Sequence, residues 1–127
     1  MASSVLLEFK GRVVDSRRQL IPGMLITRIE SDDGKVTLEM DTHEELIVFH
    51  RGQEVEVYIS RTKPEYREEI DYVVHATLAS LKEAGEGENA YLFSAGGLLF
   101  MLRTPLKLDV KPTEKVFIKV APTQVTK

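Results

Sequence analysis

The sequence predicts an all-β protein, either a barrel or a sandwich, and three observations favour this fold class. Apolar and polar residues alternate over most of the chain, as they do in strands with one buried face. Short segments with Gly and Asp, which favour tight turns, separate these runs. The chain has 127 residues, enough to bury one core, and contains no repeat or linker. We therefore expect a single domain over residues 1–127 with short flexible termini.

The first half of the chain contains the first predicted strands. Residues 5–12 alternate, and Gly11 interrupts this run, so we expect a bulge or a sharp bend there. Residues 24–29 form a mostly apolar run and residues 36–41 alternate again. The Asp33-Gly34 pair between them is a strong turn signal, which predicts a hairpin.

Three further runs alternate with period two later in the chain, at residues 54–59, 106–111 and 115–120. Pro112 separates the last two, because proline ends regular strand pairing. We expect all three runs to be strands.

Residues 91–95 and 98–102 are two dense apolar runs with Gly96-Gly97 between them. Glycine adopts positive φ at little cost, and a Gly-Gly pair is typical of a two-residue hairpin turn. Both faces of these two predicted strands carry large apolar groups. One face can fill a core, whereas the other needs a cover, either from an adjacent segment of this chain or from a partner protein.

The segment from Ile70 to Ala84 fits two structures equally well. Val73, Val74, Leu78 and Leu81 lie at helical spacing, and the second half is rich in good helix formers. Read with period two, Ile70, Tyr72, Val74, Ala76 and Leu78 share one face of a strand. The pattern of the residues leaves helix and strand both open.

Composition restricts the class of protein. The absence of cysteine excludes disulfides and thiolate chemistry. The formal charge of −3 gives no overall attraction to nucleic acid. No apolar run approaches the roughly 20 residues that span a bilayer. The N-terminus lacks the basic start of a secretory signal, so we expect a cytoplasmic protein.

The sequence offers no catalytic or cofactor-binding pattern. The histidines at positions 43, 50 and 75 form no HExxH arrangement, and each is interpreted as solvated or locally hydrogen-bonded. The glycines form no phosphate-binding motif, and adjacent acidic residues on a strand point to opposite faces. We therefore predict no catalytic residues, no cofactor and no metal, and a protein that is not an enzyme by itself.

Lys115, Phe117 and Lys119 share the outward face of one predicted strand. Cationic side chains beside an exposed ring are typical of proteins that bind single-stranded nucleic acid. The alternative is that these lysines only keep a strand soluble, which is favoured because there is one aromatic residue and because Asp109 and Glu114 reduce the local positive charge.

Three segments in the same order carry a family resemblance. They are "KVTLEMDTHEELIVFHRGQEVEVYIS", "DYVVHATLASLKE" and "AYLFSAGGLLFMLRTP". Together they resemble the small RNA polymerase subunit that is numbered eight in eukaryotes and designated by the letter G in archaea, over roughly residues 4–120. The last segment weighs most, through Tyr91, Ser94, Gly96, Gly97, Leu98, Leu99, Met101, Leu102 and Arg103.

The resemblance implies a single antiparallel β-barrel of the OB-fold type, in which residues 70–82 form a strand. It also implies a non-catalytic peripheral subunit of DNA-directed RNA polymerase that docks on the largest subunit and supports assembly or stability of the enzyme. Nucleotidyl transfer belongs to that partner. The short segment "SRTKPEYREEI" replaces a longer polar insertion of eukaryotic members, so the chain resembles the archaeal form.

We predict that the outer face of the apolar hairpin contacts the large polymerase subunit. The residues proposed for this interface are Gly96, Gly97, Leu98, Leu99, Met101 and Arg103. The alternative function is a free-standing OB-fold protein that binds single-stranded nucleic acid through Lys115, Phe117 and Lys119. The scarcity of exposed aromatic residues favours the polymerase subunit.

Overall fold

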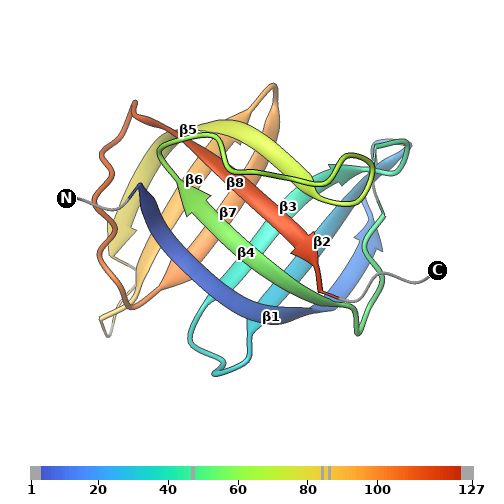
Figure 1. Ribbon diagram of the computed structural model, residues 1–127, viewed down its shortest axis with the longest axis horizontal. Coiled ribbons are helices and arrows are strands. Elements are labelled where there is room, and N and C mark those ends of the chain that lie inside the picture. Colours follow the sequence, from blue (N-terminus) through green and yellow to red (C-terminus); the bar gives the residue numbers. More distant parts are fainter. Residues whose placement is uncertain (1–3, 47, 84, 86, 124–127) are drawn as a thin grey trace.

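A computed structural model describes residues 4–46, 48–83, 85 and 87–123. The termini that were expected to be flexible lie largely outside these residues. The described chain contains eight strands and no helix (Figure 1). They are β1 (Val5–Arg18), β2 (Met24–Ser31), β3 (Thr37–His43), β4 (Glu54–Ser60), β5 (Tyr72–Glu83), β6 (Asn89–Ala95), β7 (Leu98–Thr104) and β8 (Lys115–Pro122).

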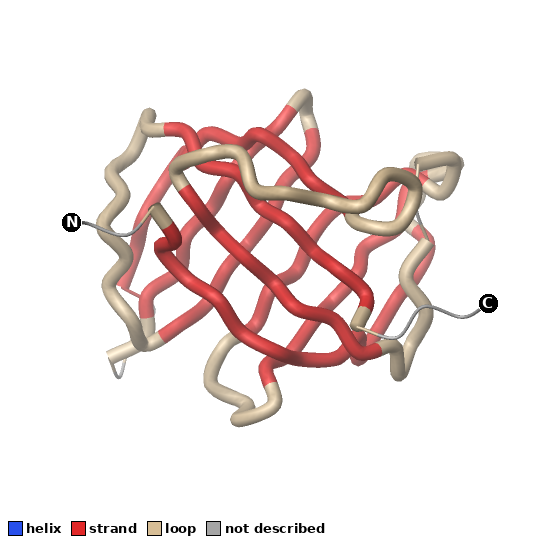
Figure 2. The backbone as a smooth tube through the Cα atoms, in the orientation of Figure 1, coloured by secondary structure: helices blue, strands red, loops and turns tan. Residues whose placement is uncertain are grey.

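The strands form one closed barrel in the order β1-β2-β3-β7-β6-β5-β8-β4. Every neighbouring pair is antiparallel. The tube in Figure 2 shows the strands wrapping around a common interior. This confirms the all-β prediction, and the closed antiparallel barrel is consistent with the OB-fold type.

The interior of the barrel is filled by alternating side chains from all strands. Ile29, Leu38, Ile59, Phe93 and Ile118 are among the fully buried residues. Their apolar surface supplies most of the driving force for folding, at about 25 cal/mol for each Å² removed from water. Two buried threonine hydroxyls, of Thr27 and Thr42, lie in this interior and satisfy each other at 3.3 Å.

Strand β5 settles the ambiguity of residues 70–84 in favour of a strand. Its residues 72–77 pair with β8 and its residues 77–83 pair with β6. Ala76 and Leu78 are buried in the core as period two requires. Pairing on both sides outweighs the helix propensity of the second half, because strand preference depends strongly on tertiary context. The strand implied by the family resemblance is therefore confirmed.

The structure has no bulge at Gly11, which was one of the two irregularities expected there. This glycine pairs in regular register with Ser31 and Val55, and the bulges of β1 lie instead between Val5 and Leu7 and between Val13 and Asp15. A Cβ atom at Gly11 would lie 2.2 Å from the carbonyl oxygen of Glu30. Glycine is needed at this position because two backbones approach closely, which is the other common reason for glycine in a strand.

The alternating run at residues 106–111 is not a strand, which corrects that prediction. Both neighbours of β7 and of β8 are already occupied in the closed barrel, so this segment has no sheet edge to join. It crosses the end of the barrel as a loop (Figure 2). Leu108 and Val110 are buried there, and the backbone N–H of Leu108 donates to the Tyr91 hydroxyl at 2.8 Å. The alternation therefore reflects an extended plug with one apolar side.

The segment at residues 61–71 connects β4 to β5 across the outside of the barrel, because β8 lies between these two strands (Figure 1). We call residues 61–71 the strap. It lies over β8, since the side chain of Lys119 donates to the carbonyl oxygen of Glu65 at 2.6 Å. The strap forms one wall of a groove on the surface of the barrel.

Candidate functional site

The β6–β7 hairpin turns through Gly96 and Gly97, as predicted. Their φ angles are +56° and +87°, and positive φ at both central residues is the condition for a type I′ turn, whose twist matches that of paired strands. Strand pairing then fixes which side chains face the core. Phe93 and Phe100 are opposite each other and fully buried.

The outer face of the hairpin carries a strip of apolar side chains. Leu92 and Met101 are cross-strand partners and both are partly buried. Leu99 follows on the same face of β7 and is 47% exposed. We call Leu92, Leu99 and Met101 the outer strip. No segment among the described residues covers Leu99, so the chain itself leaves this part of the strip open to a partner.

Charged residues border the outer strip. Arg103 lies at the far end of β7 with its guanidinium 3.9 Å from the carboxylate of Glu88. Glu39 is the partner of Met101 on β3 and lies 3.9 Å from Arg28. An apolar centre with a polar rim is the usual arrangement of a protein-protein interface.

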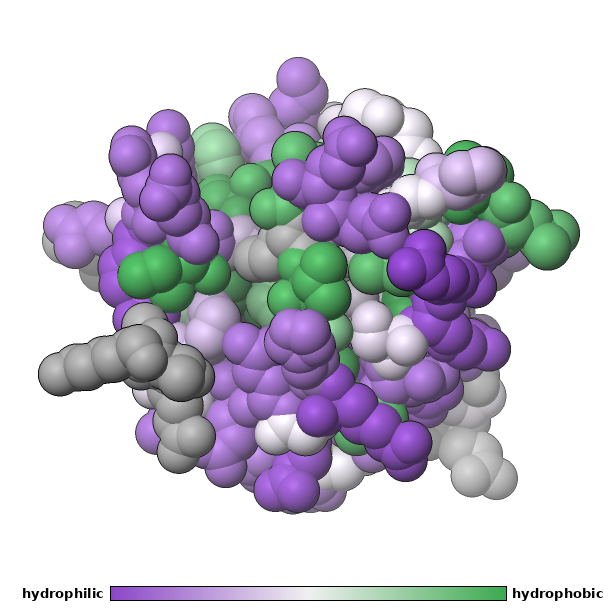
Figure 3. Space-filling model, turned by 90° about the vertical axis from the view of Figure 1, so that its right-hand side faces the viewer, coloured by the Kyte–Doolittle hydropathy of each residue, from purple (hydrophilic) through white to green (hydrophobic). Residues whose placement is uncertain are grey.

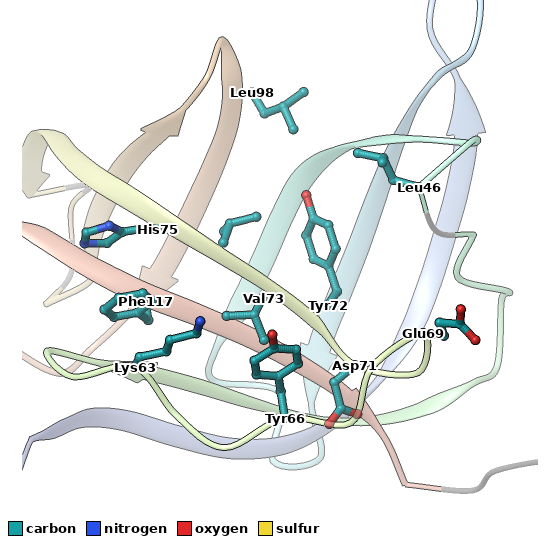
Figure 4. A pocket seen from close by; sticks show the side chains of 11 residues that line it. Leu46, Lys63, Tyr66, Glu69, Asp71, Tyr72, Val73, His75, Leu98 and Phe117 are labelled. Atoms are coloured by element: carbon teal, nitrogen blue, oxygen red, sulfur yellow. The ribbon is translucent and has the colours of Figure 1, made fainter.

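A groove with a volume of about 550 Å³ lies between the strap, β5 and the hairpin. Leu46 and Leu98 lie along one side, and Lys63 and Tyr66 of the strap lie along the other (Figure 4). Val73, Val74 and Tyr72 of β5 line the groove between these sides. Leu98 belongs to the predicted interface set and directly precedes Leu99 of the outer strip in β7.

Tyr72, one of the residues that line this groove, has a buried hydroxyl without a partner. The residue is only 8% exposed, and its ring packs edge-to-face on Phe49 with ring centroids 6.2 Å apart. Among the described residues, its hydroxyl is the buried side-chain polar group that lacks a hydrogen bond. Burial, and then the charge of Asp41, raise the pKa of Tyr72 to about 12, so the hydroxyl keeps its proton as a donor.

The strap is held to β8 by a buried carboxylate. The Asp71 side chain is 1% exposed and lies 2.7 Å from the Arg67 guanidinium and 3.9 Å from the Lys119 ammonium. Arg67 also donates to the carbonyl oxygen of Pro122 at 2.8 Å. Burial alone raises the pKa of Asp71, but hydrogen bonds from Arg67 and the nearby positive charges outweigh it, so the pKa lies below its usual value.

The proposed nucleic-acid residues lie on β8 as expected, but two of them have partners. Phe117 is stacked on His75, a neighbour that sequence reasoning did not identify as part of this site. The Lys119 ammonium is used by the strap, and Lys115 is exposed. Pairing between distant strands brings His75 to Phe117, and no local sequence signal indicates it.

Ionisable residues elsewhere form no cluster suited to a metal ion, within the residues that the structure describes. The His43 ring accepts a hydrogen bond from the backbone N–H of Glu45 at 3.1 Å, as the local interpretation of this histidine expected. No helix in the described part of the chain is long and apolar enough to cross a membrane. Figure 3 shows the end of the barrel at the right of Figure 1, where apolar side chains form small patches between hydrophilic ones.

The fold defines a closed antiparallel β-barrel, which is consistent with the OB-fold type. The model of the RpbG family of DNA-directed RNA polymerase subunits matches residues 6–123. The chain therefore belongs to this family, and it is an RNA polymerase subunit that acts within a multisubunit enzyme. No curated protein sequence matches the chain.

Proposed function

We propose that this protein is a non-catalytic peripheral subunit of archaeal DNA-directed RNA polymerase, located in the cytoplasm. It docks on the largest subunit and supports assembly or stability of the transcribing enzyme. The family match over residues 6–123 supports the polymerase as the assembly. The short segment between Ile59 and Asp71 supports the archaeal form, since eukaryotic members of the family carry a longer polar insertion there.

The outer strip is the observation that carries the docking proposal. The inner face of the β6–β7 hairpin is already buried, through Tyr91, Phe93, Phe100 and Leu102. Leu99 on the outer face remains 47% exposed although its neighbours on the strip are apolar. Covering such a strip by a partner removes apolar surface from water, which is the main driving force of association.

Gly96, Gly97 and Arg103 have supporting roles in the proposed interface. The two glycines are exposed at the hairpin tip, and a Cβ atom on either would meet nothing within 4 Å. The partner can therefore approach the backbone of the tip closely. The exposed Arg103 guanidinium lies at the rim, where charge contributes to orientation and association rate more than to affinity.

The test is incorporation of a Leu99→Asp/Met101→Asp variant into polymerase, measured by quantitative mass spectrometry after affinity purification through the largest subunit. Two carboxylates in an apolar contact lose solvation without gaining a partner. We expect incorporation to fall more than about tenfold, because each 1.4 kcal/mol of lost binding energy is tenfold. Circular dichroism must show that the variant keeps its barrel.

The matched control is Leu20→Asp/Ile21→Asp, which adds the same charge at two exposed apolar residues in the β1–β2 loop. We expect this control to assemble normally. If both variants lost incorporation equally, the added charge alone would explain the effect. Normal incorporation of the folded Leu99→Asp/Met101→Asp variant would exclude the outer strip as the docking surface.

A second candidate function is weak contact with single-stranded nucleic acid, and the stacked rings of His75 and Phe117 beside exposed Lys115 favour it. The isolated protein should then bind a labelled oligonucleotide in a salt-dependent manner, and Phe117→Ala should weaken that binding. Leu106→Ala, at an exposed residue of the loop, is the control. Absence of binding at low salt would exclude this function for the isolated chain.

A further inference from the structure

One edge of β5 is unpaired along its first half. Strand β6 pairs with β5 only from Thr77 onward, whereas β8 pairs with it from Tyr72 onward. On the side of the hairpin, residues 72–76 therefore have no neighbouring strand in the described chain. A strand edge of this kind presents backbone donors and acceptors that another chain can pair with.

The ladder identifies which residues of β5 point to the open edge. The backbone N–H and C=O of Leu78 both bond toward the segment before β8, to Glu114 at 2.9 Å and to Thr113 at 2.8 Å. Backbone groups of successive strand residues point to alternate sides of the strand in an antiparallel ladder. The register from Tyr72 to Thr77 contains no bulge on the β8 side. Val73 and His75 therefore direct their N–H and C=O groups to the open edge.

The open edge faces the groove that contains the unpartnered hydroxyl of Tyr72. Val73 and His75 both line this groove, and Leu46 and Leu98 stand across from them. Figure 4 shows the Tyr72 hydroxyl directed toward the space between Leu98 and Leu46. The groove thus combines a row of backbone hydrogen-bonding groups, a buried donor and apolar walls.

We infer that an extended segment of the partner polymerase subunit adds to β5 as a further strand in this groove. Its backbone pairs with Val73 and His75, an apolar side chain lies between Leu46 and Leu98, and an oxygen acceptor bonds the Tyr72 hydroxyl. This inference rests on the proposed function and deepens it, because Leu98, which lines the groove, is the neighbour of Leu99 in β7. Strand addition at an exposed sheet edge is a common mode of peptide recognition.

The chemistry of the groove favours a polypeptide over a nucleic acid. Only an extended peptide supplies alternating N–H and C=O groups at the spacing of a strand edge. Glu69, Asp71 and Lys63 are the charged residues that line the groove. The Asp71 carboxylate is paired with Arg67 and Lys119. Within the described chain, the groove therefore has no row of free cations that would attract phosphates. A second copy of this chain could supply the same backbone groups, and hydrogen exchange on a dimer of the free chain distinguishes this occupant from a polymerase segment.

The first experiment is amide hydrogen exchange on the wild-type protein, free and within assembled polymerase. The amides of Val73 and His75 should exchange rapidly in the free protein and at least about tenfold more slowly in the complex, because the added strand would hold them in hydrogen bonds. The Val74 amide is the control, since it points to β8 and should be protected in both states. Unchanged exchange at Val73 and His75 would overturn the inference.

The second experiment compares Val73→Pro with Val73→Thr. Proline removes the N–H at the open edge without removing a bond to β8, and edge positions tolerate proline. We expect Val73→Pro to remain folded and to lose incorporation about tenfold, whereas Val73→Thr keeps the N–H and assembles normally. Full incorporation of folded Val73→Pro would contradict the added strand. If this variant does not fold, the exchange measurement decides.

Tyr72→Phe tests the acceptor on the partner. Removing an unpartnered buried hydroxyl should leave the free protein equally or more stable, while its binding to polymerase weakens several-fold. Undiminished binding of Tyr72→Phe would show that the hydroxyl does not bond to the partner. Protection of Val73 and His75 in a dimer of the free chain, or on adding an oligonucleotide, would assign the groove to those occupants instead.

The two proposals fail in different ways. If wild-type protein does not enter polymerase, the proposed function is wrong. A different result is that wild-type protein and Val73→Pro both enter polymerase while Leu99→Asp/Met101→Asp does not. In that case the outer strip is the docking surface and the proposed strand addition is wrong.

Discussion

The imidazole ring of His75 lies flat on the phenyl ring of Phe117, with centroids 4.2 Å apart and planes 3° from parallel. The two residues are cross-strand partners on the outward face of β5 and β8. Each ring covers one face of the other. This contact joins the strand whose edge is open to the strand that lies under the strap.

The His75–Phe117 stack should contribute measurably to stability. We expect a double-mutant cycle of His75→Ala and Phe117→Ala, measured by urea unfolding, to give a coupling energy of about 1 kcal/mol, as found for stacked ring pairs. A cycle of His75→Ala with Lys115→Ala is the control and should give a value near zero. Equal couplings in the two cycles would mean that the ring contact adds nothing specific.

The strap should make stability depend on acid pH. The lowered pKa of Asp71 means that the folded protein holds its carboxylate charged at a pH where the unfolded chain binds a proton. This stabilisation is complete above the ordinary pKa of 3.8 and is lost as pH falls through the lower pKa of the folded state. Asp71→Asn should therefore be less stable than wild type at pH 7, and the difference should shrink below about pH 4.

Urea unfolding of wild type and Asp71→Asn between pH 7 and pH 3 measures this effect. Asp109→Asn is a matched control, because that carboxylate is 93% exposed in its ion pair with Arg61. Exposed pairs contribute little, so its curve should follow wild type. A constant difference between Asp71→Asn and wild type at all pH values would contradict the assigned charge of Asp71.

The buried hydroxyl pair of Thr27 and Thr42 should show a non-additive response. Thr27→Val leaves the Thr42 hydroxyl in the core without a partner, which costs about 1–3 kcal/mol of unfolding free energy. Thr27→Val/Thr42→Val removes both hydroxyls and keeps the shape, so it should recover most of that loss. Thermal unfolding of the two variants measures the difference. If Thr27→Val/Thr42→Val were less stable than Thr27→Val, this would contradict the expected recovery and show that the hydroxyl pair makes a net contribution to the stability of the barrel.

The hairpin tip should tolerate substitution unequally at its two glycines. Asparagine is favoured in the first central position of a type I′ turn, so Gly96→Asn should change stability little. Gly97→Val places a β-branched residue at a φ of +87° and should cost about 1–3 kcal/mol. Chemical unfolding of both variants tests this, and equal costs would contradict the turn type.

The local features of the fold could be predicted from the sequence because neighbouring residues encode them. Asp33-Gly34 and Gly96-Gly97 specify their turns, and period two identifies the strands that flank them. Period two also places Leu99 and Met101 on one shared face, whereas the pairing of the barrel decides that this face is the outer one. At residues 106–111 the period of two wrongly predicts a strand. Alternation shows that one side of a segment is apolar, but it does not show that a neighbouring strand is available for pairing.

The sequence by itself determined the hairpins, the buried face of the strands that alternate cleanly and, through its family motifs, membership of the polymerase subunit family. Only the tertiary structure decided that residues 72–83 pair as a strand, that His75 meets Phe117 and that one edge of β5 faces a groove. Turns and alternation depend on residues a few positions apart. Strand order, an unpaired edge and the unpartnered Tyr72 hydroxyl depend on how the barrel closes between residues far apart in the chain.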